Sequence, residues 1–211
     1  MTRIKFCGIT RLQDAELAVS LDAWAIGMIM WPGSSRFIEP AAAAGIAAQV
    51  RRKLEVAGVF VNPSLEEVVR TAETAGLSLV QLHGQEGPAF CAEVARRTGC
   101  RVIKAARVRS RAEIQALAPF HTDFHLLDSY VAGRPGGTGR AFAWELAAAH
   151  GSKIPVILSG GLTPDNVAEG VGKVRPYAVD VASGVESGPG IKDPGLMRAF
   201  AAAVAPVGSP S

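Results

Sequence analysis

The chain has 211 residues, of which 48% are hydrophobic and 19% charged, and its formal net charge is +3. This length suits one domain with a sizeable core and is short for two, and the composition is ordinary for a globular protein. Nucleic-acid binders usually carry clustered basic residues with interleaved aromatic residues. The densest basic clusters here, 51–53 and 96–97, stand at the polar ends of helical stretches. We therefore interpret them as solvated helix termini and expect no nucleic-acid partner.

Three cysteines, Cys7, Cys91 and Cys100, are present. Their odd number and irregular spacing do not suggest a disulfide framework, and no Cys/His spacing typical of a metal site occurs. The chain opens without the apolar stretch of a signal peptide, and no apolar run is long enough to span a bilayer. We expect a cytoplasmic protein with no membrane partner and no bound metal.

Short apolar runs alternate with amphipathic, alanine-rich stretches along the whole chain. The runs predict eight strands, at 4–9, 25–30, 56–61, 78–83, 102–108, 124–128, 155–159 and 178–182. The stretches between them predict eight helices, at 11–21, 39–52, 64–75, 86–97, 111–117, 144–150, 164–171 and 194–204.

Capping signals support several of these helices. Ser64 followed by Glu67 fits a capping box. Thr163 followed by Pro164 fits an N-cap with proline at the first helical position. Three glycines fit C-terminal caps: Gly76, Gly99 and Gly151.

Strict alternation of strands and helices predicts an α/β protein with a parallel sheet. A doubly wound open sheet is one possible closure, but it normally has fewer strands. We therefore predict a single-domain (β/α)8 TIM barrel over residues 1–205, with 206–211 as a frayed C-terminal tail.

Reactive side chains gather at the predicted carboxyl ends of the strands, where the chemistry of such barrels takes place. They come from five strand ends or the loops after them: Cys7, Arg36, His83, Asp128 and Asp180. We therefore expect the functional site on this rim.

The alternation of side chains along a strand predicts one contact inside the barrel. In the first strand Ile4 and Phe6 are apolar and face the helices, which turns Lys5 and Cys7 toward the barrel axis. In the last strand two valines likewise turn Asp180 inward. Because the first and last strands are neighbours in a closed barrel, we predict that Lys5 and Asp180 pair.

Two glycine turns predict a phosphate site. They come at the ends of the seventh and eighth strands, and the substrate-binding residues expected there are Gly160, Gly161, Asp180, Ser183 and Gly184. Glycine lets backbone N–H groups approach a phosphate, and barrels often bind phosphate at this location. The alternative is that these glycines serve only tight turns. Neither of the common nucleotide-loop motifs, GxxxxGK[ST] and GxGxxG, occurs.

These features occur in a family-specific order: KFCGIT at 5–10, WPGSSR at 31–36, GVFV at 58–61, VQLHG at 80–84, LDS at 127–129, GGTG at 136–139, LSGGL at 158–162 and DVASGVE at 180–186. Together they resemble the phosphoribosylanthranilate isomerase family over nearly the whole chain. Two departures are Ala182, where the family often has serine, and Ala143, where it often has aspartate. Alanine at position 182 keeps the backbone amide, so phosphate binding is still expected.

The resemblance implies an activity and roles for several residues. The family carries out an Amadori rearrangement of N-(5-phosphoribosyl)anthranilate in tryptophan biosynthesis. It implies that Cys7 is the general base, that Asp128 is the general acid and that Arg36 holds the anthranilate carboxylate. Lys5 and His83 are expected to support the site. No organic cofactor is expected, and the partner is a small phosphorylated substrate bound by a monomer or homodimer.

The residue types fit this chemistry. An aspartic acid that donates a proton near neutral pH needs a raised pKa, through burial or a nearby anion. A cysteine acts as a base only as thiolate. We expect that Lys5, or the backbone amides of 8–10, lowers the pKa of Cys7. The planar fork of an arginine matches a carboxylate.

Each residue alone has a plainer interpretation. A lone cysteine in a strand is usually a small buried hydrophobe, and Cys91 and Cys100 keep that interpretation. An aspartate after a strand often caps a turn, and an arginine in a loop is often solvated. Lys104 is ambiguous, and Glu186 is a candidate cap for a short helix after the last strand. The glycine-rich segment 133–140 is either a lid over the substrate or a surface loop.

Two other functions are weighed against this interpretation. The isomerase family of histidine biosynthesis uses two aspartates, one of them in the first strand. This chain has Cys7 in the first strand, which argues against that family. A non-catalytic phosphate-ligand binder on the same scaffold is expected to lack the acid or the base. Both Cys7 and Asp128 are present.

Overall fold

The computed structural model describes residues 1–128, 144–148 and 150–205. Eight parallel strands pair in chain order, and β8 pairs with β1 to close a barrel. They are β1 (Arg3–Cys7), β2 (Ala25–Ile29), β3 (Glu55–Phe60), β4 (Leu79–Leu82), β5 (Arg101–Arg107), β6 (Phe124–Asp128), β7 (Val156–Ser159) and β8 (Ala178–Val181). The predicted barrel is confirmed, and the open sheet is excluded.

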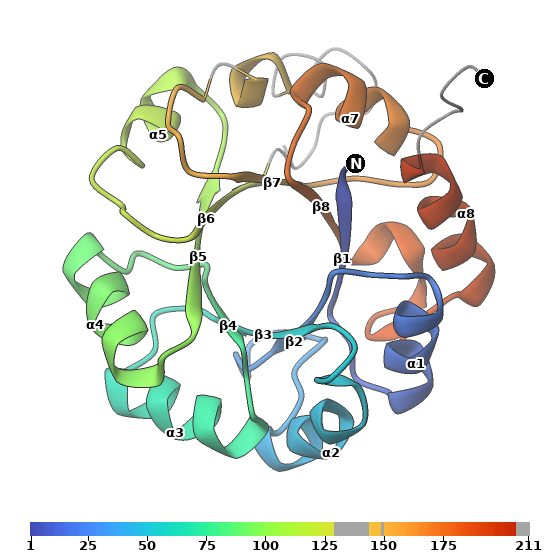
Figure 1. Ribbon diagram of the computed structural model, residues 1–211, viewed down its shortest axis with the longest axis horizontal. Helices are drawn as coiled ribbons and strands as arrows, with labels where there is room; N and C mark the ends of the chain where they lie inside the picture. Colours follow the sequence, from blue (N-terminus) through green and yellow to red (C-terminus); the bar gives the residue numbers. More distant parts are fainter. Residues whose placement is uncertain (129–143, 149, 206–211) are drawn as a thin grey trace.

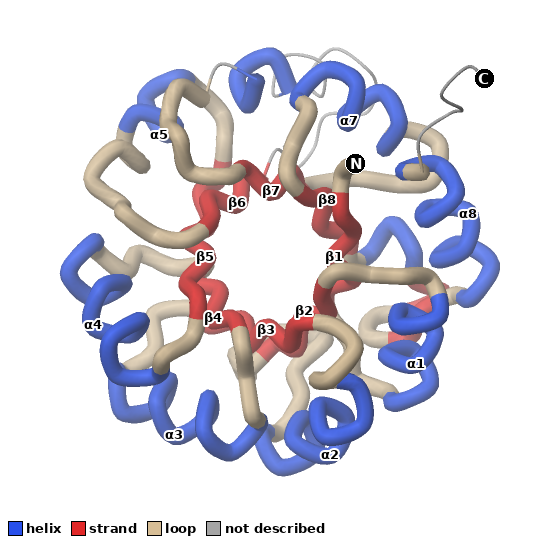
Figure 2. The backbone as a smooth tube through the Cα atoms, in the orientation of Figure 1, coloured by secondary structure: helices blue, strands red, loops and turns tan. Residues whose placement is uncertain are grey.

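Helices form an outer ring around the strands (Figures 1 and 2). They are α1 (Leu12–Ser20), α2 (Pro40–Val50), α3 (Leu65–Ala75), α4 (Pro88–Thr98), α5 (Arg111–Gln115), α7 (Val167–Val174) and α8 (Pro194–Val204), and residues 144–148 are also helical. The loop after β8 holds three short elements: η1 (Ser183–Val185), β9 (Glu186–Gly188) and β10 (Ile191–Lys192). The short helix η1 matches the candidate helix after the last strand, and the two strands were not predicted.

Most predicted helix ends are confirmed. Ser64 accepts a hydrogen bond from the Glu67 N–H at 3.2 Å. Gly76 and Gly99 have the left-handed conformation of helix C-caps, with φ of 59° and 67°. Gly151 is not among the glycines with positive φ, so the third predicted cap is wrong.

The start of α7 is also corrected, because the helix begins at Val167 and not at Pro164. The side chain of Asn166 accepts a hydrogen bond from the Thr163 N–H at 2.9 Å and donates one to the Gly161 carbonyl at 3.0 Å. These two bonds hold a separate turn after β7, which delays the helix by three residues.

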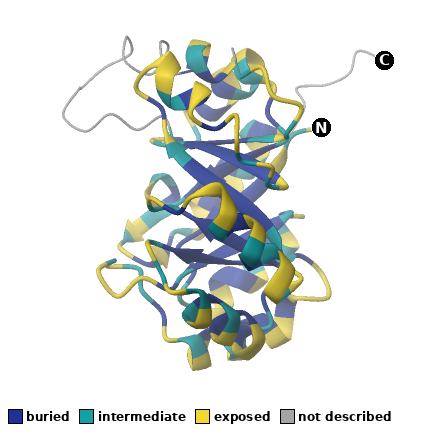
Figure 3. Ribbon diagram, turned by 90° about the vertical axis from the view of Figure 1, so that its left-hand side faces the viewer, coloured by how far each residue is buried: buried dark blue, intermediate teal, exposed yellow. Residues whose placement is uncertain are grey.

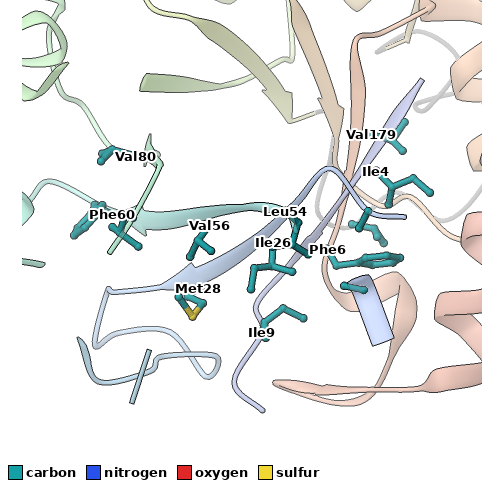
Figure 4. Packing of buried hydrophobic residues seen from close by; sticks show 14 of the residues in the cluster. Ile4, Phe6, Ile9, Ile26, Met28, Leu54, Val56, Phe60, Val80 and Val179 are labelled. Carbon is teal, nitrogen blue, oxygen red and sulfur yellow. The ribbon is translucent and has the colours of Figure 1, made fainter. Parts of the chain in front are cut away.

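One apolar layer lies outside the barrel wall and a second lies inside it. The outer layer, between strands and helices, includes Ile4, Phe6, Val179 and Val181, which confirms the predicted strand faces. Figure 4 shows part of this layer around β1, β2 and β3. The strands are the most deeply buried part of the molecule (Figure 3).

The barrel interior is apolar toward the amino ends of its strands. Trp24, Phe124 and Tyr177 meet there with ring centroids 5.1 to 5.3 Å apart. Above them the interior is lined mainly by alanine, leucine and isoleucine side chains. Polar groups therefore gather toward the carboxyl ends of the strands. None of the described helices is long and apolar enough to cross a membrane.

A pair of histidines, of which His125 is fully buried, joins β6 to the helical layer. His125 Nδ1 lies 2.9 Å from His150 Nε2, and His125 Nε2 lies 3.0 Å from the Phe120 carbonyl oxygen. Since Nε2 must donate to that carbonyl, Nδ1 accepts a hydrogen bond from His150, and both rings are neutral. Burial lowers the pKa of His125 from 6.5 to about 4.

We predict that the pair makes folding sensitive to acid. Between pH 6.5 and 4 the unfolded chain binds a proton that folded His125 does not bind, so the free energy of unfolding falls as pH decreases. The loss is up to about 3 kcal/mol. His125→Gln should show a shallower decrease in urea titrations over this range than wild type. The exposed His121→Gln is the control; equal slopes for wild type and His125→Gln would contradict the prediction.

Candidate active site

The predicted acid and base lie at the carboxyl ends of two strands that are not neighbours in the barrel. Cys7 ends β1 and Asp128 ends β6. Figure 2 shows that β7 and β8 separate these two strands on one side of the ring. A ligand over the centre of the barrel therefore lies between a thiol and a carboxyl group.

Beneath this rim, Lys5 and Asp180 form the predicted ion pair, with 2.7 Å between Nζ and Oδ1. Their side chains are 0% and 6% exposed. Ser159 Oγ donates a hydrogen bond to the other carboxylate oxygen of Asp180 at 3.1 Å. Burial lowers the pKa of Lys5, but the Asp180 carboxylate and Cys7 raise it by more, so it ends above its ordinary value. Lys5 is therefore a permanent cation beside Cys7.

The expectation for the pKa of Cys7 is wrong in its net direction. Lys5 and Lys192 do lower this pKa, but burial raises it by more, and Asp180 adds to the increase. The thiol is only 5% exposed. Since desolvation disfavours the charged form, Cys7 is a thiol at neutral pH in the unliganded protein.

Gly27 on β2 leaves room for these two groups and was not singled out from the sequence. A Cβ atom at this position would lie 2.8 Å from Cys7 Sγ and 2.8 Å from Lys5 Nζ. Any side chain here would displace the proposed base. No sequence pattern marks this role, because a glycine inside a strand usually indicates only a bulge or a close approach.

Arg36 is engaged by a carboxylate of the chain itself. Its Nε donates hydrogen bonds to both carboxylate oxygens of Glu186, at 2.9 and 3.0 Å, and its Nη2 donates a third at 2.6 Å. Glu186 is the C-cap residue of η1 and begins β9, so its predicted place as the cap of a short helix after the last strand is confirmed. The aliphatic part of the Arg36 side chain passes close to Gly8. A Cβ atom on Gly8 would lie 2.7 Å from the Cδ atom of Arg36.

Lys192 links this pair to the proposed base, and no sequence pattern indicated it. Its Nζ donates hydrogen bonds to Glu186 at 2.8 Å, to the Ala182 carbonyl at 3.0 Å and to the Cys7 carbonyl at 2.5 Å. Burial lowers the pKa of Lys192, and Glu186 offsets part of that effect. Burial raises the pKa of Glu186, but Arg36 and Lys192 lower it by more, so it stays a carboxylate.

A second ion pair holds this loop in place. Arg11 donates to both carboxylate oxygens of Asp14, at 2.9 and 2.7 Å, and also to the Lys192 carbonyl at 3.1 Å. The Lys192 N–H donates to Asp14 at 3.3 Å. The loop after β8 is thereby fastened to the loop after β1.

His83 lies beside the proposed acid, with its Nε2 3.7 Å from Asp128 Oδ2. The Gln81 side-chain nitrogen lies 3.3 Å from His83 Nδ1. The next turn is anchored from below, because Lys104 donates to Glu86 at 2.6 Å and to the Gly84 carbonyl at 2.8 Å. Lys104, ambiguous in the sequence, therefore positions the turn after His83.

The two glycine turns after β7 and β8 lie against each other. Gly160 and Gly161 have φ of 94° and 64°, in the region that favours glycine. A Cβ on Gly184 would lie 1.8 Å from the Leu162 carbonyl oxygen. Ser183 begins η1 in the second turn. The turns thus come close enough to serve one ligand. Segment 133–140, for which the sequence left both a lid and a surface loop open, lies outside the described residues.

Known proteins place the chain in a family. A sequence model described as "N-(5'phosphoribosyl)anthranilate (PRA) isomerase" matches residues 4–203. The chain belongs to this family. The N-(5'-phosphoribosyl)anthranilate isomerase of Citrifermentans bemidjiense is 50% identical over 198 residues, which cover 94% of each chain.

Solved structures agree with this placement. Phosphoribosyl anthranilate isomerase from Thermus thermophilus has a TM-score of 0.85 and 41% identity, and the match covers 97% of this chain and 98% of that one. A further isomerase, in complex with reduced 1-(o-carboxyphenylamino)-1-deoxyribulose 5-phosphate, has a TM-score of 0.84 and 35% identity over 95% of this chain and 97% of that one.

We predict that Gly27→Ala damages the site from within. The new methyl group would press on Cys7 and Lys5, and overpacking of this kind costs about 1–3 kcal/mol. The thermal unfolding temperature and kcat/KM should both decrease. Gly45→Ala in α2 is the matched control, because its Cβ would meet nothing within 4 Å. An unchanged kcat/KM in Gly27→Ala would show that this crowding does not matter.

Proposed function

We propose that the chain isomerises N-(5-phosphoribosyl)anthranilate to 1-(2-carboxyphenylamino)-1-deoxyribulose 5-phosphate, a step of tryptophan biosynthesis. Membership of the isomerase family supports this activity. The observation that carries the mechanism is the placement of Cys7 and Asp128 at the carboxyl ends of two non-neighbouring strands of one barrel rim. An acid and a base on two sides of a ligand suit a reaction made of proton transfers.

The reaction begins at the furanose ring. Asp128 gives its proton to the ring oxygen as the bond from C1 to that oxygen breaks, and the nitrogen lone pair forms a protonated Schiff base. The minor fraction of Cys7 that has lost its proton to solvent, the thiolate, then takes the proton on C2, and the electron pair of that C–H bond moves toward the nitrogen to give an enolamine. The enolamine tautomerises to the aminoketose. Proton transfers alone complete this sequence, so no organic cofactor or metal is part of the proposal.

The remaining residues bind the substrate. The adjoining turns with Gly160, Gly161, Ser183 and Gly184 are the proposed phosphate site, since glycine turns let backbone N–H groups approach an anion. Arg36 holds the anthranilate carboxylate. Asp180 and Lys5 set the charge beneath Cys7, and His83 stands next to the acid.

The protein is proposed to act in the cytoplasm as a monomer or homodimer. Its partner is a small phosphorylated molecule, and no nucleic-acid or membrane partner is proposed. The absence of a disulfide among Cys7, Cys91 and Cys100 is compatible with a reducing compartment.

The proposed base gives a prediction about pH. Because burial holds the pKa of Cys7 above its ordinary value, the thiolate fraction keeps rising with pH past the point where an ordinary cysteine is fully ionised. The rate of Cys7 alkylation by iodoacetamide, measured by peptide mass spectrometry, should therefore reach half of its plateau value above about pH 8 to 9, the range in which an ordinary thiol is half ionised. A half-maximal rate in or below that range would mean that the cations around Cys7 offset or outweigh the effect of its burial.

The activity itself is tested by the loss of anthranilate-type fluorescence from phosphoribosylanthranilate generated in situ. Wild type should turn over, and Cys7→Ala and Asp128→Ala should each lower kcat by roughly a hundredfold or more, the range for general acid or base catalysis. Cys91→Ala is the control for loss of a buried cysteine away from the rim. An inactive wild type would refute the substrate, and the histidine-pathway ribonucleotide is tried next. An active Asp128→Ala would refute the assignment of the acid alone.

A further inference from the structure

Three charged side chains from two loops, after β2 and after β8, meet beside Cys7. Arg36 comes after β2, Glu186 begins β9 and Lys192 lies in β10. Glu186 stands between the two cations and bonds to both, at 2.6 Å from Arg36 Nη2 and 2.8 Å from Lys192 Nζ. We call these residues the Arg36–Glu186–Lys192 trio.

The hydrogen bonds occupy only one edge of the Arg36 guanidinium. Glu186 takes Nε and Nη2, which form the inner edge next to the stem. No hydrogen bond joins Nη1 to another residue within 1–128, 144–148 and 150–205. The outer edge, formed by Nη1 and Nη2, is the second place where a guanidinium receives a carboxylate with two parallel N–H groups. The Arg36 side chain is 23% exposed, so this edge is within reach of a ligand.

The charge of the trio suits an anionic ligand. An arginine paired with one glutamate is neutral overall and attracts a second carboxylate weakly. Lys192 adds a second cation on the far side of Glu186, so two cations and one carboxylate leave one net positive charge. Glu186 can therefore hold Arg36 in place while the trio as a whole still attracts a carboxylate.

Glu186 is itself fixed and is not a mobile stand-in for a ligand. Its side chain is 4% exposed, and that of Lys192 is 0% exposed. If Glu186 moved away to admit a ligand carboxylate, Lys192 would be left buried without its anion, which is strongly unfavourable. Lys192 is also tied to the Cys7 and Ala182 carbonyls. A ligand carboxylate is thus expected to join the trio and not to displace Glu186.

We infer that Glu186 is a positioning residue for carboxylate recognition: it orients Arg36 so that the outer edge of the guanidinium meets the carboxylate on the aromatic ring of the ligand. This inference rests on the proposed function, in which Arg36 holds that carboxylate. It adds that selectivity for a ring carboxylate depends on a residue that does not touch the ligand.

The test compares two ligands that differ only in this carboxylate. One is reduced 1-(o-carboxyphenylamino)-1-deoxyribulose 5-phosphate, and the other is its phenylamino counterpart without the carboxylate. The measured quantity is the ratio of their dissociation constants by calorimetry. In wild type the carboxylate should improve binding by roughly ten- to a hundredfold, as for hydrogen bonds between charged groups. Glu186→Gln should lower this preference roughly three- to tenfold, the cost of reordering one long side chain.

Affinity for the ligand without the carboxylate separates positioning from general damage. It should stay within about twofold of wild type in Glu186→Gln, whereas a loosened fold would weaken both ligands alike. Glu93→Gln on α4 is the matched control, because it removes the partner of Arg96 in a similar two-pronged pair on the outer surface. It should leave both affinities unchanged.

Glu186→Asp covers the case in which Glu186→Gln does not fold. Aspartate keeps the negative charge beside Lys192 but is one methylene shorter, so it cannot hold Arg36 and Lys192 at the same distances. The preference should again fall. If Glu186→Asp keeps the wild-type preference for the ligand with the carboxylate, charge alone matters and the inference is overturned. If this preference increases, Glu186 competes with the ligand carboxylate, which also overturns the inference.

Arg36→Gln distinguishes this inference from the proposed function. If Arg36→Gln abolishes the preference and the Glu186 variants keep it, the inference fails and the role of Arg36 stands. If Arg36→Gln keeps the preference, the proposed role of Arg36 fails, and the inference fails with it.

Discussion

The arrangement of the site depends on one buried cation. Lys5 is completely buried inside the barrel, and an unpaired ammonium group in such a place costs several kcal/mol. Its partner, Asp180, lies on β8, at the other end of the chain, and the register places the two residues opposite each other. The pair is made only when β8 meets β1, so closure of the barrel and charge balance beneath Cys7 are the same event.

The Arg36–Glu186–Lys192 trio organises the rim of the barrel around a second buried lysine. Lys192 is buried, and its neighbours Glu186 and Arg36 come from different loops. The Arg11–Asp14 pair then fastens the Lys192 backbone to the first helix. These contacts fix the loop after β8 against the ends of β1 and β2. The loop with the proposed phosphate-binding turn is therefore held by ionic contacts around the proposed base.

Hydrophobic period and strand order were enough to predict the barrel and the ion pair inside it. Alternation along β1 and β8 turns Lys5 and Asp180 inward, and strand order makes them neighbours. The same signals did not predict β9, β10 or the place of Lys192, because a buried lysine in a short irregular loop has no periodic signature. The start of α7 was misplaced because the Asn166 side chain bonds back to the turn, a contact that the Thr163-Pro164 pattern does not reveal. The net pKa direction of Cys7 depends on its burial, which a sequence does not contain.

The conflict between burial and charge at Cys7 connects these features. Lys5 and Lys192 both stabilise a thiolate there, yet burial outweighs them in the unliganded protein. Because Cys7 is mostly a thiol, it reacts little with electrophiles in solvent. The two neighbouring lysines reduce the free energy needed to form the thiolate when the reaction requires a base. Asp180 and Glu186 have the complementary effect of keeping the two lysines in place without neutralising the region completely. The same buried pairs that close the barrel therefore also set how readily its proposed base can form.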